Sequence, residues 1–187
     1  MRINKDYIIK ITIEIFSVVF AVLLALWLNE RKEAKQHKKL ALQAEENIRI
    51  ELNENLEVLS KAVPRYDSYI TRLDSAILTY EQNPQLTKKF NVGASLSVIT
   101  TVAWETTKTS KAINYIDFDR VMGYSKIYEV HKMYKDELDE YIHDMADKEF
   151  NDKNKKVIWK LKRQRKHLSE VQNITKQLNK ALQGLRL

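Results

Sequence analysis

The stretch IFSVVFAVLLALWL, residues 15–28, carries no charged side chain. It belongs to a longer segment, residues 7–28, that is bracketed by Tyr7 and Trp27. A helix between these two rings rises about 30 Å, the thickness of the hydrocarbon core of a bilayer. Aromatic rings favour the two headgroup levels. The segment therefore predicts a membrane-spanning helix within an N-terminal anchor of residues 1–29.

Two other interpretations of this segment were weighed. A cleaved signal peptide ends in small residues of the A-x-A type, whereas this apolar run continues into Leu26-Trp27-Leu28-Asn29-Glu30-Arg31. A buried core helix is the second alternative, because Glu14 shortens the uncharged run. The membrane span is the interpretation that we carry forward.

The basic residues on either side of the span predict its orientation. Cytoplasmic flanks of membrane spans carry the excess of Lys and Arg. The N-terminal side holds Arg2, Lys5 and Lys10, whereas the C-terminal side holds Arg31, Lys32, Lys35, Lys38 and Lys39. This imbalance favours a cytoplasmic C-terminal domain on a single-pass protein of the bacterial inner membrane.

One face of the span carries small residues at helical spacing. Ser17, Ala21 and Ala25 repeat every four residues, and Glu14 precedes them on the same side. Small side chains let a second helix approach closely, and an intramembrane carboxylate normally faces protein. We therefore predict helix packing in the membrane through these four residues. The alternative is that Glu14 lies near the interface and pairs with Lys10.

The remaining residues, 30–187, predict an all-α fold. The chain contains only three Gly and two Pro, too few for the many turns of a β-rich fold. The absence of Cys excludes disulfides and thiolate metal sites. The anchor is expected to continue into a long helix, followed by an antiparallel helical bundle.

Apolar spacing predicts the individual helices. One helix carries Ile48, Leu52, Leu56, Leu59 and Val63, with the glutamates between them facing outward. Pro64 is expected to end or kink it. A second helix, with Tyr66, Tyr69, Ile70, Leu73, Ile77 and Tyr80 on its apolar face, stops at Asn83-Pro84. Residues 95–108 are ambiguous between strand and helix, and favour helix. Asp117 is expected to cap a helix that reaches about Phe150.

The last helix, residues 152–185, is amphipathic and basic. Its apolar positions follow a heptad frame: Val157, Leu161, Leu168, Val171, Leu178, Leu182 and Leu185. This frame indicates packing in the bundle or, alternatively, an intermolecular coiled coil. Residues 153–166 hold eight Lys or Arg with Trp159 among them. This run is a solvated face, a lipid contact or a nucleic-acid contact, and nucleic acid is the least favoured. The residues predicted to contact anionic lipid are Lys160, Lys162, Arg163 and Lys166.

Two stretches resemble a set of bacterial proteins that have an N-terminal span, a helical domain and no assigned function. The first is residues 14–31, although here Trp27 precedes Asn29 where those proteins often place Asn first. The second comprises Ala103-Trp104-Glu105, Ser110-Lys111-Ala112-Ile113, Tyr115-Ile116-Asp117 and Tyr128. The resemblance covers residues 7 to about 130. It implies the same architecture and no activity.

Motifs for catalysis or cofactor binding are lacking in the sequence. It contains no Gly-rich phosphate loop, no H-E-x-x-H and no G-x-S-x-G. Glu140 and His143 have the spacing of a helical metal site, but a di-iron bundle needs a second such pair. We therefore assign no catalytic, cofactor-binding or metal residues and expect no enzyme.

The function predicted is that of an interaction protein, a scaffold or accessory subunit of a membrane complex. Its expected partners are membrane lipid and either a second copy of the chain or another membrane protein. The alternative is a membrane-tethered sensor or regulator that binds a ligand in its helical domain.

Overall fold

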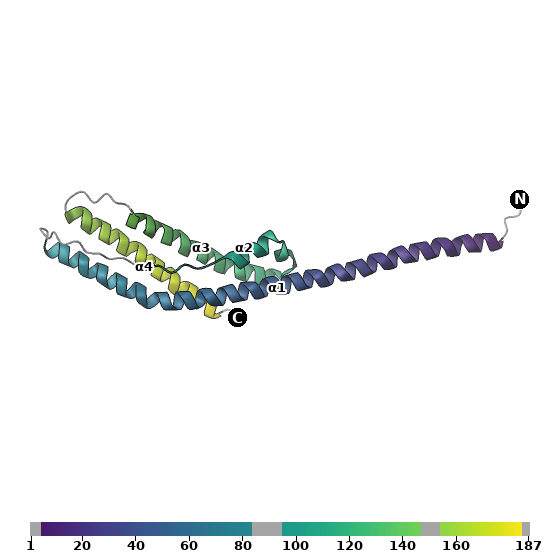
Figure 1. Ribbon diagram of the computed structural model, residues 1–187, viewed down its shortest axis with the longest axis horizontal. Helices are drawn as coiled ribbons and strands as arrows, with labels where there is room; N and C mark the ends of the chain where they lie inside the picture. Colours follow the sequence, from purple (N-terminus) through teal and green to yellow (C-terminus); the bar gives the residue numbers. More distant parts are fainter. Residues whose placement is uncertain (1–4, 84–94, 147–153, 185–187) are drawn as a thin grey trace.

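The computed structural model describes residues 5–83, 95–146 and 154–184, which contain helices and no strand. In chain order these are α1 (Lys5–Gln82), α2 (Val102–Thr109), the short 3₁₀ helix η1 (Ala112–Tyr115), α3 (Phe118–Ala146) and α4 (Asn154–Gly184). Figure 1 shows the N-terminal part of α1 projecting far beyond the bundle that the rest of α1 forms with the other elements. The predicted all-α fold, with a long N-terminal helix and an antiparallel bundle, is confirmed.

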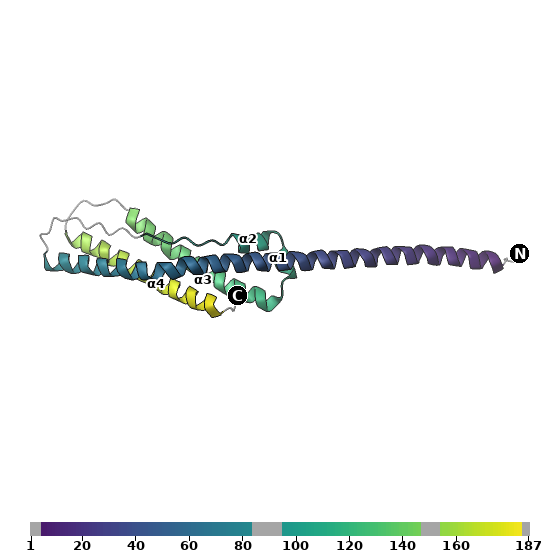
Figure 2. The ribbon, with the colours of Figure 1, turned by 60° about the horizontal axis from the view of Figure 1, so that its bottom comes forward.

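Helix α1 has three parts with different surroundings. The side chains of residues 13–36 are all exposed, and this part contains the apolar run. From Ala41 onward one side of α1 is buried in the bundle. The residues between the apolar run and Ala41 form a polar arm, about 18 Å long at 1.5 Å per residue. The arm joins the apolar part to the bundle without a break in the helix (Figure 2).

The sequence predicts that Pro64 either ends or kinks the first helix. The predicted end is wrong, because α1 runs through Pro64 to Gln82. Proline removes one helical hydrogen bond, in this case to the carbonyl of Ser60. Pro64 lies on the exposed side of α1, where water reaches that carbonyl. On the opposite side Ala62 and Tyr66 are fully buried, and their packing holds the helix together. Figure 1 shows a bend in the blue-to-teal part of α1.

Because α1 is one helix, its buried face follows one heptad frame. The buried face includes Asn55 and Ala62, whereas the predicted Leu56 and Val63 are only half-buried. Glu51 is also buried, which corrects the expectation that it faces outward. The positions at alternating spacings of four and three are Ile48, Leu52, Asn55, Leu59, Ala62, Tyr66, Tyr69, Leu73, Ala76 and Tyr80.

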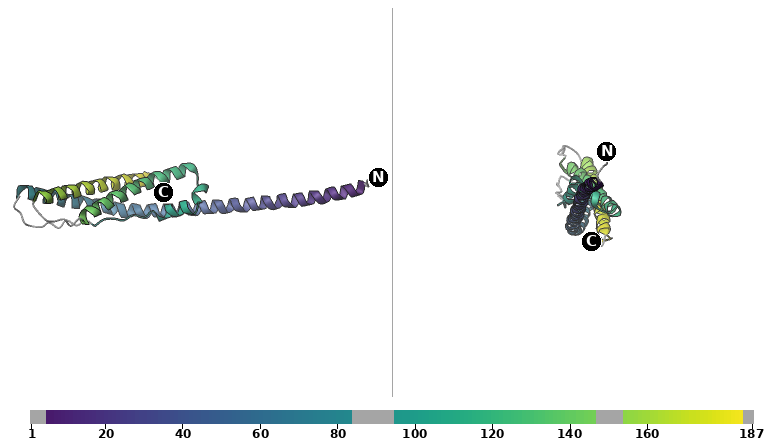
Figure 3. Two further views of the ribbon diagram at one scale, coloured as in Figure 1. Left: turned by 90° about the horizontal axis from the view of Figure 1, so that it is seen from above. Right: turned by 90° about the vertical axis from the view of Figure 1, so that its right-hand side faces the viewer.

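Helix α4 packs antiparallel to α1 and also against α3 (Figure 3). Most of its described heptad positions are buried within the chain, as the bundle interpretation of this helix predicts, and Val157 is half-buried. The positions below 9% exposure are Leu161, Leu168, Val171, Thr175, Leu178 and Leu182. Ion pairs of Lys162 with Glu81 at 2.6 Å and of Arg165 with Asp74 at 2.8 Å define the antiparallel alignment.

The second element of the bundle is an extended segment followed by a short helix. Residues 95–101, which we call the strap, have no regular secondary structure, so the favoured helix over 95–108 is right only for α2. Ser95 contacts Tyr69, and Ala103, just after the strap, contacts Glu51, so this segment runs antiparallel to α1. Since α3 then runs parallel to α1 and α4 returns, the bundle has an up-down-up-down order.

The end of the bundle nearest the arm is closed by η1. Ala112 and Ile116 are buried against Ala41 and Ala44 of α1. The Asp117 carboxylate accepts hydrogen bonds from the backbone N–H groups of Asp119 and Arg120 at 3.0 and 3.3 Å, which confirms the predicted N-cap. The predicted boundaries at Phe150, Asp152 and Leu185 lie outside the described residues.

Candidate functional site

The predicted packing face of the span is open. Glu14, Ser17, Ala21 and Ala25 are all exposed, and within the described chain nothing packs on them. The Ser17 hydroxyl donates to the carbonyl of Ile13 at 2.8 Å, so its polar group is satisfied within the helix. The side chain of Lys10, the alternative partner of Glu14, lies outside the described residues.

The apolar residues of the same segment are also uncovered. Phe16 is 69% exposed and Leu23 is 59% exposed, and no residue of the apolar window is buried in the protein. Exposed to water, each such side chain would lack the stabilisation of about 1.5–3 kcal/mol that full burial provides. The helix is long and apolar enough to cross a membrane.

A polar clamp on α1 holds the strap and the start of α2. The Glu51 carboxylate accepts hydrogen bonds from the Tyr128 hydroxyl at 2.6 Å and from the Ala103 N–H at 2.8 Å. The Asn55 side chain donates to the Thr100 carbonyl at 2.7 Å and accepts from the Thr100 N–H at 3.0 Å. Glu51 thus caps the N-terminus of α2, where the N-cap residue Thr101 forms no side-chain hydrogen bond. Asn55 satisfies both backbone polar groups of Thr100.

Three tyrosines hold the other half of the strap. The Tyr134 hydroxyl donates to the Ser97 carbonyl at 2.6 Å, and the Ser97 N–H donates to the Tyr66 hydroxyl at 3.2 Å. The two hydroxyls lie 2.9 Å apart, so Tyr66 donates to Tyr134 and closes the network. The Ser95 N–H donates to the Tyr69 hydroxyl at 3.0 Å. Burial, together with these hydrogen bonds, raises the pKa of Tyr134 well above its usual range.

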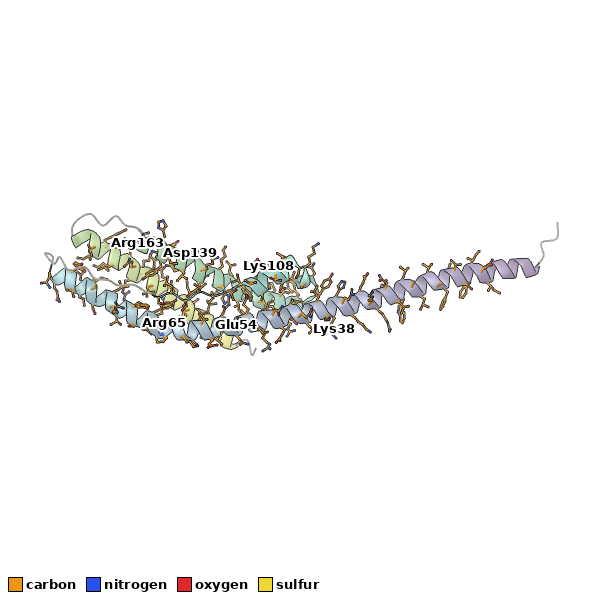
Figure 4. All side chains as sticks on the ribbon, in the orientation of Figure 1. Lys38, Glu54, Arg65, Lys108, Asp139 and Arg163 are labelled. Carbon is orange, nitrogen blue, oxygen red and sulfur yellow. The ribbon has the colours of Figure 1, made fainter. Side chains whose placement is uncertain are left out.

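A cleft of about 640 Å³ opens between α3 and the strap with α2. Its wall residues from the strap and α2 are Val98, Ile99, Thr101, Trp104, Glu105 and Lys108. Those from α3 are Ser125, Tyr128, Glu129, His131, Lys132, Tyr134, Lys135, Leu138, Asp139 and Ile142. Figure 4 labels Lys108 and Asp139, which belong to the two sides of the cleft. Clefts of this volume are typical of small-molecule sites.

His131 is the unusual residue of this cleft. It is 1% exposed, and neither ring nitrogen has a hydrogen-bond partner in the described chain. Its ring meets the edge of Tyr128, with 5.1 Å between the centroids. Burial lowers the pKa of His131 to about 4, so the imidazole is neutral at pH 7 and offers one donor and one acceptor.

The basic run of α4 lies at the end of the bundle far from the apolar part of α1. Figure 4 labels Arg163 near that end and Lys38 at the arm. Lys162 pairs with Glu81, which follows Leu28 by about 80 Å of helix. Arg163 lies over the Trp159 ring, 5.4 Å from its centroid, and Lys166 is 3.9 Å from Glu170.

Two cations of this run, Lys162 and Arg165, therefore link α4 to acidic residues of α1. Contact of Lys160, Lys162, Arg163 and Lys166 with anionic lipid stays a prediction. In this arrangement such a lipid surface would lie far from the one that holds the span.

The Glu140–His143 pair does not belong to the candidate metal cluster that the described residues form. That cluster joins Glu137 of α3 to His167 and Glu170 of α4, with ligand atoms within 4.8 Å of one another. His167 Nδ1 lies 2.5 Å from Glu137 and 3.8 Å from Glu140. Burial raises the pKa of Glu137, and the hydrogen bond with His167 opposes this effect. The contact links α3 to α4, and we assign it no metal.

The residues of the second stretch that carries the family resemblance, between Ala103 and Tyr128, pack against one another or against α1. Trp104 stacks on Tyr128, with 5.1 Å between centroids and 5° between planes. Tyr115 stacks on His37 of the arm, with 3.9 Å between the ring centroids. Ala112 is buried against α1. These residues hold α2, η1 and α3 to α1, so their spacing serves the fold.

No family model, curated protein or solved structure matches this chain. The resemblance to bacterial single-span proteins therefore stays a prediction.

Sequence reasoning missed Glu51, Asn55 and His131. Glu51 is one acid among several in this part of the sequence, so nothing distinguishes it from exposed glutamates such as Glu54. Asn55 does have a signal, since it is a polar residue on the heptad frame of α1. His131 could not have been recognised, because its surroundings come from the strap and from α2, which are distant in sequence.

Glu51→Ala should destabilise the bundle by about 3 kcal/mol, since it leaves the buried Tyr128 hydroxyl and Ala103 N–H without an acceptor. Denaturation of the full chain in detergent measures the loss, and amide exchange at Ala103 should accelerate. The matched control is Glu54→Ala on the exposed side, expected within about 0.5 kcal/mol of wild type. Equal losses for both variants would contradict the clamp.

Acid should weaken the fold through His131. Because the pKa is about 4 in the folded protein against 6.5 ordinarily, the unfolded chain binds the proton first as pH falls. The contribution of neutral His131 to the free energy of unfolding is fully present above pH 6.5. About 3 kcal/mol of it is lost as the pH falls to about 4. Denaturation across this range should show a smaller acid loss in His131→Phe than in wild type. Carboxylates titrate in both proteins, so only the difference reports on His131, and parallel curves would refute the assignment.

Proposed function

We propose that this protein is a single-pass membrane protein whose helical bundle and span serve interactions within a membrane complex. The observation that carries the proposal is the uncovered apolar run of α1, which continues without a break into the bundle. A continuous helix couples the position of the span to that of the bundle, because it contains no flexible joint. Such an arm suits a scaffold or accessory subunit that holds its bundle at a set distance from the membrane.

The partner in the membrane is another helix, from a second copy or from a different membrane protein. Glu14, Ser17, Ala21 and Ala25 provide the face for it, and all four are uncovered in the chain. Without an aqueous hydrophobic effect between spans, close approach at small residues supplies the van der Waals contact that favours association. Glu14 gains a protein environment in the same contact.

Ala21→Leu or Ala25→Leu should weaken association, because the larger side chain holds the two helices apart. Crosslinking in native membranes measures the change. Val22→Leu adds comparable bulk on another face of the span and should have a smaller effect. Equal crosslinking of all three variants would remove the packing role of the small residues.

The excess of basic residues that follow the span favours a cytoplasmic bundle. An alkaline-phosphatase fusion after Leu187 should therefore be inactive, and a fluorescent-protein fusion at the same position should be bright. The opposite pair of results would place the bundle on the far side of the membrane. Loss of both fusions from the membrane fraction would count against the anchor itself.

A second candidate function is that of a membrane-tethered sensor or regulator. The observation that favours it is the cleft beside the strap, together with the unpaired ring nitrogens of His131. A ligand held there would contact α3, the strap and α2 at once. Because the strap is hydrogen-bonded to α1, a ligand that shifts the strap would also affect the helix that enters the membrane.

A further inference from the structure

The cleft follows from the shape of the second bundle element. In an up-down-up-down bundle a full helix, about 10 Å wide, would fill the space between α1 and α3. Here an extended strap and the eight-residue α2 occupy that place. The strap is fastened to α1 through Asn55 and Tyr66 and to α3 through Tyr134, and the uncovered space lies between the strap, α2 and α3.

The buried residues of the cleft wall are Trp104, Leu138, Tyr128, Tyr134 and His131, and the hydroxyls of the two tyrosines are already hydrogen-bonded to Glu51 and Ser97. Ile99, Leu138 and Ile142 contribute aliphatic surface, and Trp104 contributes an aromatic ring. His131 lines the same cleft with both ring nitrogens unpaired and its pKa lowered by burial. An unpaired buried donor or acceptor costs about 1–3 kcal/mol, and a ligand that bonds the ring would recover that free energy.

The charges around the cleft balance. Three lysines, Lys108, Lys132 and Lys135, face three carboxylates, Glu105, Glu129 and Asp139. Lys108 pairs with Glu105 at 2.8 Å. The cleft therefore offers no net charge to attract an ionic ligand, and a neutral imidazole does not select one.

We propose that this cleft binds a small neutral amphiphile, an apolar body with one hydroxyl or amide group that hydrogen-bonds His131. The proposal deepens the second candidate function and rests on it. A hydroxyl or amide both donates and accepts, which matches the two nitrogens of a neutral imidazole. Because His131 is 1% exposed, the head group reaches it by displacing side chains of the cleft wall.

The test uses the full chain in nanodiscs, labelled with ¹⁵N at its four histidines. The probes are 1-octanol and octanamide, with octane as the apolar control. The two polar probes should shift the ring-nitrogen signals of His131 in a saturable way and leave the signals of His37, His143 and His167 in place. Octane should not reproduce this shift. The His131→Phe variant identifies the signals and should bind octanol about fivefold more weakly than wild type does.

Filling the cleft provides the matched pair of variants. Ile142→Trp, at the cleft, should weaken octanol binding at least about tenfold. Leu78→Trp, at an exposed position of α1 outside the cleft, should leave it unchanged. Equal binding in both variants would place the probe in the bilayer and overturn the proposal.

The remaining outcomes separate the ligand class from the site. Saturable binding of octane with an equal His131 shift would overturn the polar head group while keeping the cleft as a site. No saturable response to any of the three probes would overturn both the ligand class and the sensor function. Neither outcome bears on association through the span, which crosslinking of the Ala21 and Ala25 variants measures separately.

Discussion

The hydrogen bonds that Glu51 and Asn55 form with the backbone of Thr100 and Ala103 secure the least regular part of the bundle. An extended segment has no internal hydrogen bonds, so its buried polar groups need partners from elsewhere. Helix α1 supplies them with a carboxylate, an amide and two tyrosine hydroxyls placed along one face. With the strap fixed in this way, α2 is capped and Trp104 is brought onto Tyr128.

The strap also decides where the bundle is open. It is thinner than a helix, and the space that it leaves unfilled forms the cleft between the strap, α2 and α3. On its other side α3 is covered by α4, which is packed between α1 and α3. The presence of a strap in place of a helix therefore accounts for the cleft that His131 lines.

Continuity of α1 connects this bundle to the apolar segment. Pro64 faces solvent, so the bend it introduces does not interrupt the packed side of the helix. Near the C-terminal end of α1, acidic residues pair with basic residues of α4. The opposite charges of the two helices therefore favour their antiparallel packing. The apolar run remains uncovered, and a membrane or a partner helix is the environment in which its exposure costs no free energy.

The sequence by itself determined the features that depend on neighbours along the chain. Periodic apolar residues mark the helices, Asp117 marks a cap, and residues 7–28, which include the uncharged run 15–28, mark a segment long enough to span a bilayer. The heptad frame of α4 likewise marks the face that is buried. Only the tertiary structure decided that Pro64 is tolerated, that residues 95–101 are extended and that Glu51 is buried. Each of these depends on contacts between residues far apart in sequence. There, burial and hydrogen bonds between distant segments outweigh the local conformational preference of the residue.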